Sequence, residues 1–129
     1  MGYCLSTKLN TTSFEEALER VGTELALEGF GIISTIDVSA TFKMKLDIVF
    51  KKYIILGACN PDFAHRALNS EDKVGVFLPC NVVIIEQESG EIEVAAVDPV
   101  ASMISIENAP LKAMSQEVKA KLQRVISAL

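Results

Sequence analysis

The spacing of hydrophobic residues divides the chain into alternating strands and helices. Residues 3–9 and 30–38 alternate in side-chain character, a pattern typical of strands. Between these two segments, apolar residues recur at steps of three and four, so that they share one face of a helix: Phe14, Ala17, Leu18, Val21 and Leu25. Ser13, followed three residues later by Glu16, forms a capping box at the start of this helix, and Gly29 is placed to end it.

The middle of the chain reads as three further strands with short helical segments between them. The predicted strands are residues 50–59, 73–87 and 92–98, with a hairpin turn at residues 88–91. The predicted helical segments are residues 39–49, with Ser39 as the cap, and residues 61–72.

The end of the chain reads as helical. Asp98 caps a short helix that has Pro99 at its first position. Residues 109–129 then repeat apolar side chains at helical spacing.

This order of elements predicts one α+β domain that spans residues 1–129. We expect an antiparallel β-sheet of about five strands with helices packed on one face, as a two-layer sandwich. The other face of the sheet is then open or covered by a second copy of the chain, which would make the protein a homodimer.

Composition excludes several classes of protein. Twelve basic and seventeen acidic residues give a net charge of −5, which argues against nucleic acid as a partner, because phosphate binding needs a basic surface. The three cysteines are an odd number with long gaps between them, which is a poor disulfide framework. Without a secretory signal or an apolar run long enough to span a bilayer, we expect a cytoplasmic protein with reduced thiols and no membrane partner.

The first candidate for chemistry is Cys59, at the end of a predicted strand. Asn60 is a natural N-cap and Pro61 a natural first residue of the helix that follows. A thiol beside the unpaired N–H groups of a helix start would have a lowered pKa, because those groups favour the thiolate. The alternative is a small buried cysteine that only ends a strand. His65, the one histidine of the chain, lies a turn further on, where Asp62 pairs either with it or with Arg66.

The second candidate is the sequence Leu-Pro-Cys-Asn at residues 78–81. Pro79 cannot donate to a strand ladder, so it predicts a bulge or an edge strand. Cys80-Asn81 repeats the dipeptide Cys59-Asn60, and each copy stands beside a proline. If the two strands are neighbours, Cys59, His65 and Cys80 form a soft metal site for zinc or copper, although the chain contains no CxxC motif.

Other known motifs are missing from the sequence. It has no GxGxxG, Walker, GxSxG or HExxH motif. Asp37 ends a strand and can line a pocket at the strand end, as can Asp98, although a helix cap explains Asp98 more simply. The predicted ligand-binding residues are therefore Cys59, Asn60, His65, Cys80, Asn81 and Asp37.

Four segments carry a resemblance to a known family: GFGIISTID, YIILGACNPDFAHRAL, VGVFLPCNVVI and DPVASM. In this order and spacing they resemble the domain of unknown function 302 family over nearly the whole chain. The resemblance implies a small α+β domain of the TATA-binding-protein-like fold class, and a homodimer. It implies no catalytic residue, but it places the residues of both Cys-Asn motifs, with Pro61, His65 and Pro79, among the signature positions.

Three functions remain open at this stage. The first is a ligand- or metal-binding module whose pocket is lined by cysteine, histidine and asparagine, with a small molecule or a soft metal as its partner. The second is a structural or dimerisation domain without site chemistry. The third is a thiol-dependent enzyme in which Cys59 or Cys80 is the nucleophile and His65 its base.

Overall fold

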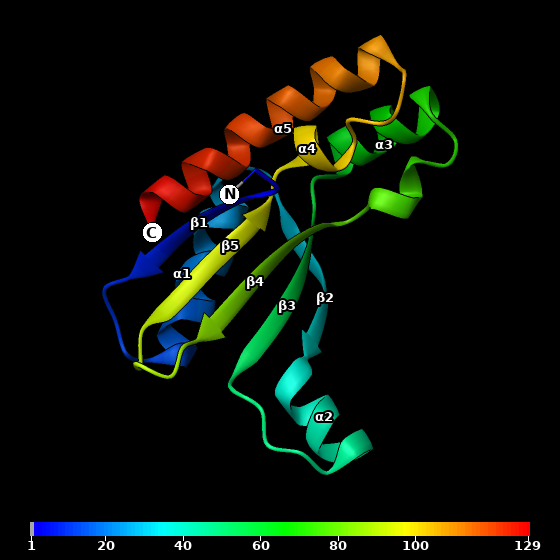
Figure 1. Ribbon diagram of the computed structural model, residues 1–129. Helices are drawn as coiled ribbons and strands as arrows, with labels where there is room; N and C mark the ends of the chain where they lie inside the picture. Colours follow the sequence, from blue (N-terminus) through cyan, green and yellow to red (C-terminus); the bar gives the residue numbers. More distant parts are fainter. Residues whose placement is uncertain (1) are drawn as a thin grey trace.

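The computed structural model of the chain describes residues 2–129 as a five-stranded antiparallel sheet with helices packed on it (Figure 1). The strands are β1 (Cys4–Leu9), β2 (Gly31–Asp37), β3 (Tyr53–Cys59), β4 (Cys80–Glu86) and β5 (Ile92–Val97). The helices are α1 (Phe14–Leu27), α2 (Val38–Leu46), α3 (Pro61–Ser70), α4 (Pro99–Ser102) and α5 (Ala109–Ala128), with a 3-10 helix, η1 (Val74–Phe77). The strand order is β1-β5-β4-β3-β2, so the predicted α+β sandwich is confirmed.

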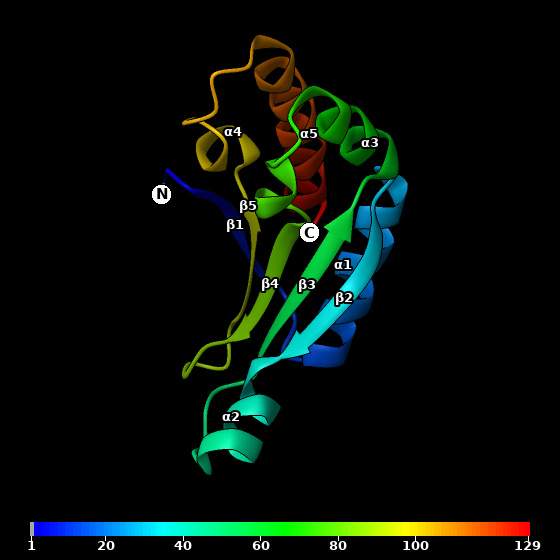
Figure 2. The same cartoon turned by 90° about the vertical axis from the view of Figure 1, so that its right-hand side faces the viewer.

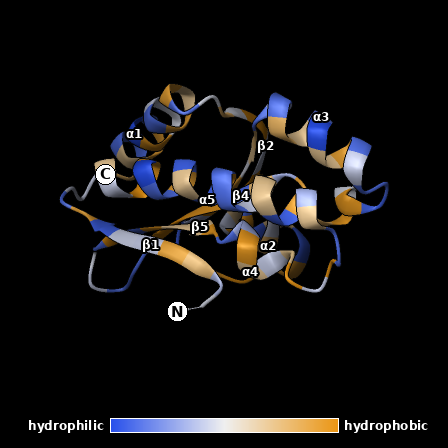
Figure 3. Cartoon of the chain, turned by 90° about the horizontal axis from the view of Figure 1, so that it is seen from above, coloured by the Kyte–Doolittle hydropathy of each residue, from blue (hydrophilic) through white to orange (hydrophobic). Residues whose placement is uncertain are grey.

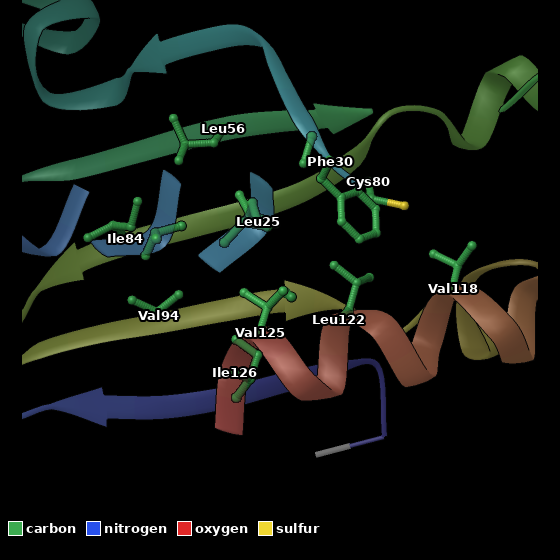
Figure 4. Packing of buried hydrophobic residues seen from close by; sticks show 14 of the residues in the cluster. Leu25, Phe30, Leu56, Cys80, Ile84, Val94, Val118, Leu122, Val125 and Ile126 are labelled. Carbon is green, nitrogen blue, oxygen red and sulfur yellow. The ribbon is translucent and has the colours of Figure 1, made fainter. Parts of the chain in front are cut away.

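The hydrophobic core lies between the sheet and the helices α1 and α5. Figure 3 shows α1, α3 and α5 on the same side of the sheet. Leu122 and Val125 of α5 and Leu25 of α1 are fully or almost fully buried against Ile84 and Val94 of the central strands (Figure 4). Burial of each such side chain contributes about 1.5–3 kcal/mol, which is why the apolar spacing in the sequence predicts the packed faces. None of the helices in the described residues is both long and apolar enough to cross a membrane.

The start of α1 keeps one of the two hydrogen bonds of the predicted capping box, and its end follows the predicted glycine stop. The backbone N–H of Glu16 donates to Ser13 Oγ at 3.2 Å. The Glu16 carboxylate accepts from Thr11 Oγ1 at 3.0 Å, and Thr11 Oγ1 in turn accepts from the backbone N–H of Ser13. Gly29 ends the helix with φ +85°, a left-handed conformation that glycine adopts at no steric cost.

The prediction of one long strand over residues 73–87 is wrong. Residues 74–77 form η1, and β4 begins only at Cys80. Pro79 causes neither a bulge nor an edge: it precedes the first residue of β4, after a cis peptide bond with Leu78, and β4 lies between β3 and β5. At this position Pro79 has no ladder hydrogen bond to donate. The bulge of the sheet lies instead in β2, between Ile32 and Ser34.

The helical segment after β2 is α2, and its cap is Asp37 instead of Ser39. Asp37 Oδ1 accepts from the backbone N–H of Ala40 and from Ser39 Oγ, each at 2.9 Å. The two hydrogen bonds, led by that from Ala40, lower the pKa of Asp37. Because Asp37 has the extended backbone of an N-cap, the helix begins directly at Val38.

α2 lies beyond the end of the sheet, away from the other helices (Figures 1 and 2). It contains no buried residue, and all seven residues of β2 are exposed. Phe42 and Phe50 hold this protruding part together with ring centroids 5.2 Å apart, edge to face. We call residues 31–52, from β2 to the start of β3, the arm.

Asp98 joins α4 to α5. Its Oδ1 accepts from the backbone N–H groups of Val100 and Ala101 at 2.9 and 3.2 Å, and its Oδ2 lies 2.9 Å from Lys119 Nζ. Burial raises the pKa of Asp98, but the hydrogen bonds from Lys119 and the two N–H groups together outweigh it, so the pKa is lowered. Asp98 is thus the N-cap of α4, which was the simpler of the two roles that the sequence allowed.

We expect Asp98→Ala to lower the free energy of unfolding by about 1–2 kcal/mol, because the first turn of α4 loses its cap. Asp98→Asn keeps the cap and loses only the ion pair, so its loss is smaller. Because the folded state lowers the pKa of Asp98, its carboxylate adds to the free energy of unfolding above about pH 4. This stabilisation is lost as the pH falls through the folded-state pKa. Urea denaturation of the three proteins measures this; an equal loss in both variants would contradict a capping role.

Candidate functional site

The two Cys-Asn motifs meet on neighbouring strands. In the β3–β4 ladder, Ala58 is the partner of Cys80 and Gly57 the partner of Asn81. Cys59 is the last residue of β3 and Cys80 the first of β4, and since the strands are antiparallel these two residues lie at the same end of the sheet. The two copies of the Cys-Asn motif, which are distant in the sequence, are therefore adjacent in the fold.

Both cysteines line one small pocket of about 210 Å³ at this end of the sheet. We call it the cysteine pocket. Its wall comes from the bulge of β2, the end of β3, the start of α3 and the segment before β4, and is lined by Ile33, Ala58, Cys59, Asn60, Phe63, Ala64, Leu78, Pro79 and Cys80. Most of these side chains are apolar, so the two thiols and Asn60 are its polar elements.

Asn60 is already engaged as the cap of α3. Its Oδ1 accepts from the backbone N–H of Phe63 at 3.2 Å, and Pro61 takes the first helical position, as predicted. The junction holds Phe63 and Ala64 against the pocket one turn into α3. The hydrogen-bonding atoms that remain for a ligand are those of the thiols and the Asn60 amide nitrogen.

Cys80 is buried, and its environment favours the protonated thiol. Burial, and to a smaller degree the neighbouring Cys59, raises the pKa of Cys80 from an ordinary 9.0 to about 11. At neutral pH the side chain is therefore a small, soft, weakly polar group. This is the opposite of the electropositive environment that activates a catalytic cysteine.

His65 does not line the cysteine pocket. It is exposed on α3, where its Nε2 lies 3.2 Å from Asn69 Nδ2. Asp62 pairs with Arg66 at 3.1 Å, the alternative that leaves His65 without a carboxylate partner. Arg66 also lies 3.2 Å from Glu117 of α5, so this charge cluster links α3 to the long helix.

Asn81 and Asp37 also lie outside the cysteine pocket. Asn81 is exposed on the face of the sheet opposite the helices, at a hollow of about 310 Å³ whose other contributors include Tyr53, Val83 and Ile85. Asp37 pairs with Ile54 at the far end of β3 and caps α2. Of the six predicted ligand-binding residues, the structure brings together Cys59, Asn60 and Cys80.

The metal prediction finds no support in the arrangement of ligands. Across residues 2–129, no group of three or more histidine, cysteine, aspartate or glutamate side chains is placed to hold a metal ion. The two thiols of the cysteine pocket fall short of the four ligands that a structural zinc site usually has.

The apolar wall of the pocket was missed from the sequence. Ile33, Phe63 and Leu78 read as ordinary strand and helix positions. The bulge of β2 brings Ile33 to the pocket, the irregular segment before β4 brings Leu78, and the helix start at Asn60 brings Phe63. Gly57 supplies the one local signal. A Cβ there would overlap Ser34 Oγ and lie 2.8 Å from Pro79 Cγ, so a glycine inside an apolar strand marks this close approach.

We expect Cys80 to react slowly with iodoacetamide at pH 8 and faster as the pH rises toward 11, because alkylation requires the thiolate. Mass spectrometry of the Cys4→Ser/Cys59→Ser variant isolates this one thiol. The same variant is expected to react at a somewhat lower pH than Cys80 does in the parent chain, since Cys59 contributes to the raised pKa. Rapid alkylation near pH 7 would contradict the buried, protonated thiol.

Comparison with known proteins places this architecture in a family. The model of the family "Domain of unknown function DUF302" matches residues 5–129. The crystal structure of an uncharacterized conserved DUF302 protein from Bacillus stearothermophilus superposes with a TM-score of 0.89 and 26% identity, over 96% of this chain and 95% of that one. A search of the curated proteins gave no match. The chain belongs to the DUF302 family.

Proposed function

We propose that the chain is a binding module for a small, mainly apolar ligand, which it holds in the cysteine pocket. The observation that carries this proposal is the convergence of Cys59 and Cys80 from neighbouring strand ends on one apolar-walled pocket. Apolar walls with a few polar atoms are the usual composition of a ligand site.

The size and chemistry of the pocket restrict the ligand. Its volume of about 210 Å³ lies below the range of roughly 300–1,000 Å³ that is common for drug-sized ligands, so the occupant is small. Asn60 Oδ1 is committed to the helix cap, and Cys80 is protonated at neutral pH. We therefore expect recognition by shape and by soft contacts of sulfur with an aromatic or aliphatic group, since sulfur packs favourably against ring edges.

The thiol-dependent enzyme is less well supported by the geometry. Its proposed base, His65, is exposed and hydrogen-bonded to Asn69, and does not line the pocket. The raised pKa of Cys80 further disfavours a nucleophile at that position. A soft metal held by the two thiols remains a separate alternative, which the experiment below distinguishes.

Indole and toluene are suitable probes, because each is small and mainly apolar. In ¹H–¹⁵N spectra we expect saturable shifts of the amides of residues 58–60, 63, 64 and 80. Ala64→Phe places a ring at the half-buried wall position of α3 and should abolish these shifts. Ala120→Phe adds the same ring at an exposed position of α5 and should leave them unchanged.

Two results would contradict the proposal. One is shifts that never saturate, or that persist in Ala64→Phe with its fold intact by circular dichroism. The other is stoichiometric binding of copper(I) or zinc that is lost in both Cys59→Ser and Cys80→Ser, with no response to indole or toluene. That second outcome would favour the metal alternative.

A further inference from the structure

We infer that the arm, residues 31–52, is the docking surface for a second copy of this chain. The arm carries large apolar side chains that are wholly or partly exposed: Ile33, Ile36, Met44, Leu46, Val49 and Phe50. Val49 is 91% exposed, Met44 79% and Ile33 65%. Apart from Ile33, which also lines the cysteine pocket, this surface is separate from the site of the proposed ligand.

α2 does not have the packing that normally stabilises a short helix. It is nine residues long with no buried residue, and isolated helices below about 12–15 residues are marginal in water. The contact of Phe42 with Phe50 and the ion pair of Lys43 with Asp47 lie within the arm itself. A partner that covers Met44, Leu46 and Val49 would supply the missing tertiary contact.

The edge strand β2 points to a second copy as the occupant. Its seven residues, Gly-Ile-Ile-Ser-Thr-Ile-Asp, contain no lysine, arginine or proline, which proteins use to block edge pairing. The bulge between Ile32 and Ser34, another such device, leaves Ser34 to Asp37 as the regular part of this edge. β2 has one neighbour, β3, so its outer edge is free among residues 2–129. An edge strand that pairs with its own copy about a two-fold axis forms an antiparallel ladder and a closed dimer. The opposite edge strand, β1, by contrast, carries Lys8.

The exposed apolar area fits a dimer interface in size. By their exposed fractions, the uncovered parts of the six residues amount to roughly several hundred Å², which is of the same order as the area of about 800 Å² that one partner gives to a standard interface. In a two-fold dimer each copy contributes the same surface, so the pair meets the size of a specific interface.

The charge of the arm differs from that of the rest of the chain. The arm holds four lysines, at positions 43, 45, 51 and 52, and two aspartates, Asp37 and Asp47, for a net charge of +2. Because the whole chain carries −5, the remaining residues carry −7. In an arm-to-arm pair the two basic arms repel each other, so the apolar side chains and the strand edge, and not charge, have to supply the attraction. A basic apolar arm also suits an anionic membrane, but lipid cannot pair a free strand edge, whereas a second β2 can.

The first experiment measures the mass of the native chain by light scattering after size exclusion. We expect twice 14.0 kDa. Met44→Asp/Val49→Asp should raise the dimer dissociation constant by roughly a hundredfold or more, the effect of losing central interface residues. Matched controls place the same charge on apolar residues outside the arm: Val76→Asp, where Val76 is 81% exposed, and Ile104→Asp, where Ile104 is 71% exposed. The controls should remain dimers.

The second experiment tests the pairing of β2 directly. At a two-fold axis the residue nearest the axis faces its own copy, so a single cysteine there can form an intermolecular disulfide under mild oxidation. Ser34→Cys and Thr35→Cys, in a background with Cys4, Cys59 and Cys80 changed to serine, should cross-link one copy to the other. Ser6→Cys, on the opposite edge strand, should not.

Three outcomes would overturn the inference. The first is a native chain that stays at 14.0 kDa up to millimolar concentration. The second is a dimer that Met44→Asp/Val49→Asp leaves as tight as the controls do. The third is a monomer that co-sediments with phosphatidylserine vesicles but not with phosphatidylcholine vesicles, which would assign the arm to a membrane surface. None of these results depends on a ligand in the cysteine pocket.

Discussion

The ladder between β3 and β4 is the interaction on which the rest of the structure depends. Its register, with Ala58 opposite Cys80 and Leu56 opposite Val82, fixes which residues of both strands face α1 and α5. A shift by one residue would move Val82 and Ile84 from the core to the open face. The same register brings the end of β3 beside the start of β4, and thereby places both cysteines at one end of the sheet.

Much of the fold is predictable from the sequence because it follows from local patterns. The serine cap at Ser13, the glycine stop at Gly29 and the Asn60-Pro61 helix start each involve a few adjacent residues, and the structure keeps all three. The second bond of the capping box is not kept, because the backbone N–H of Ser13 donates to Thr11 instead of Glu16. The segment before β4 is different. Its apolar residues suit a strand, but Val74 is buried within a 3-10 turn, and a short apolar run does not by itself distinguish the two.

The candidate site is predictable only in part, for a physical reason. That Cys59 and Cys80 share a pocket depends on strand order, which the two Cys-Asn motifs suggest but do not determine. His65 lies on α3, and its position relative to the pocket depends on how the helix is rotated on the sheet; Phe63 and Ala67 take the buried face, which leaves His65 outside. The arm is exposed because no other helix within residues 2–129 packs against α2. The apolar pattern of residues 42–50 is the same whether such a helix covers them or not, so the sequence does not predict this exposure.

Gly57 of β3 allows β2 and the segment before β4 to approach closely, because the space of its missing Cβ is taken by Ser34 and Pro79. Position 57 is therefore not independent of the other two. A family member with alanine at this position would need both a smaller residue than serine at position 34 and a segment before β4 that approaches less closely. Positions 34, 57 and 79 should consequently vary together across the family, as a three-way covariation that aligned sequences would reveal without any structure.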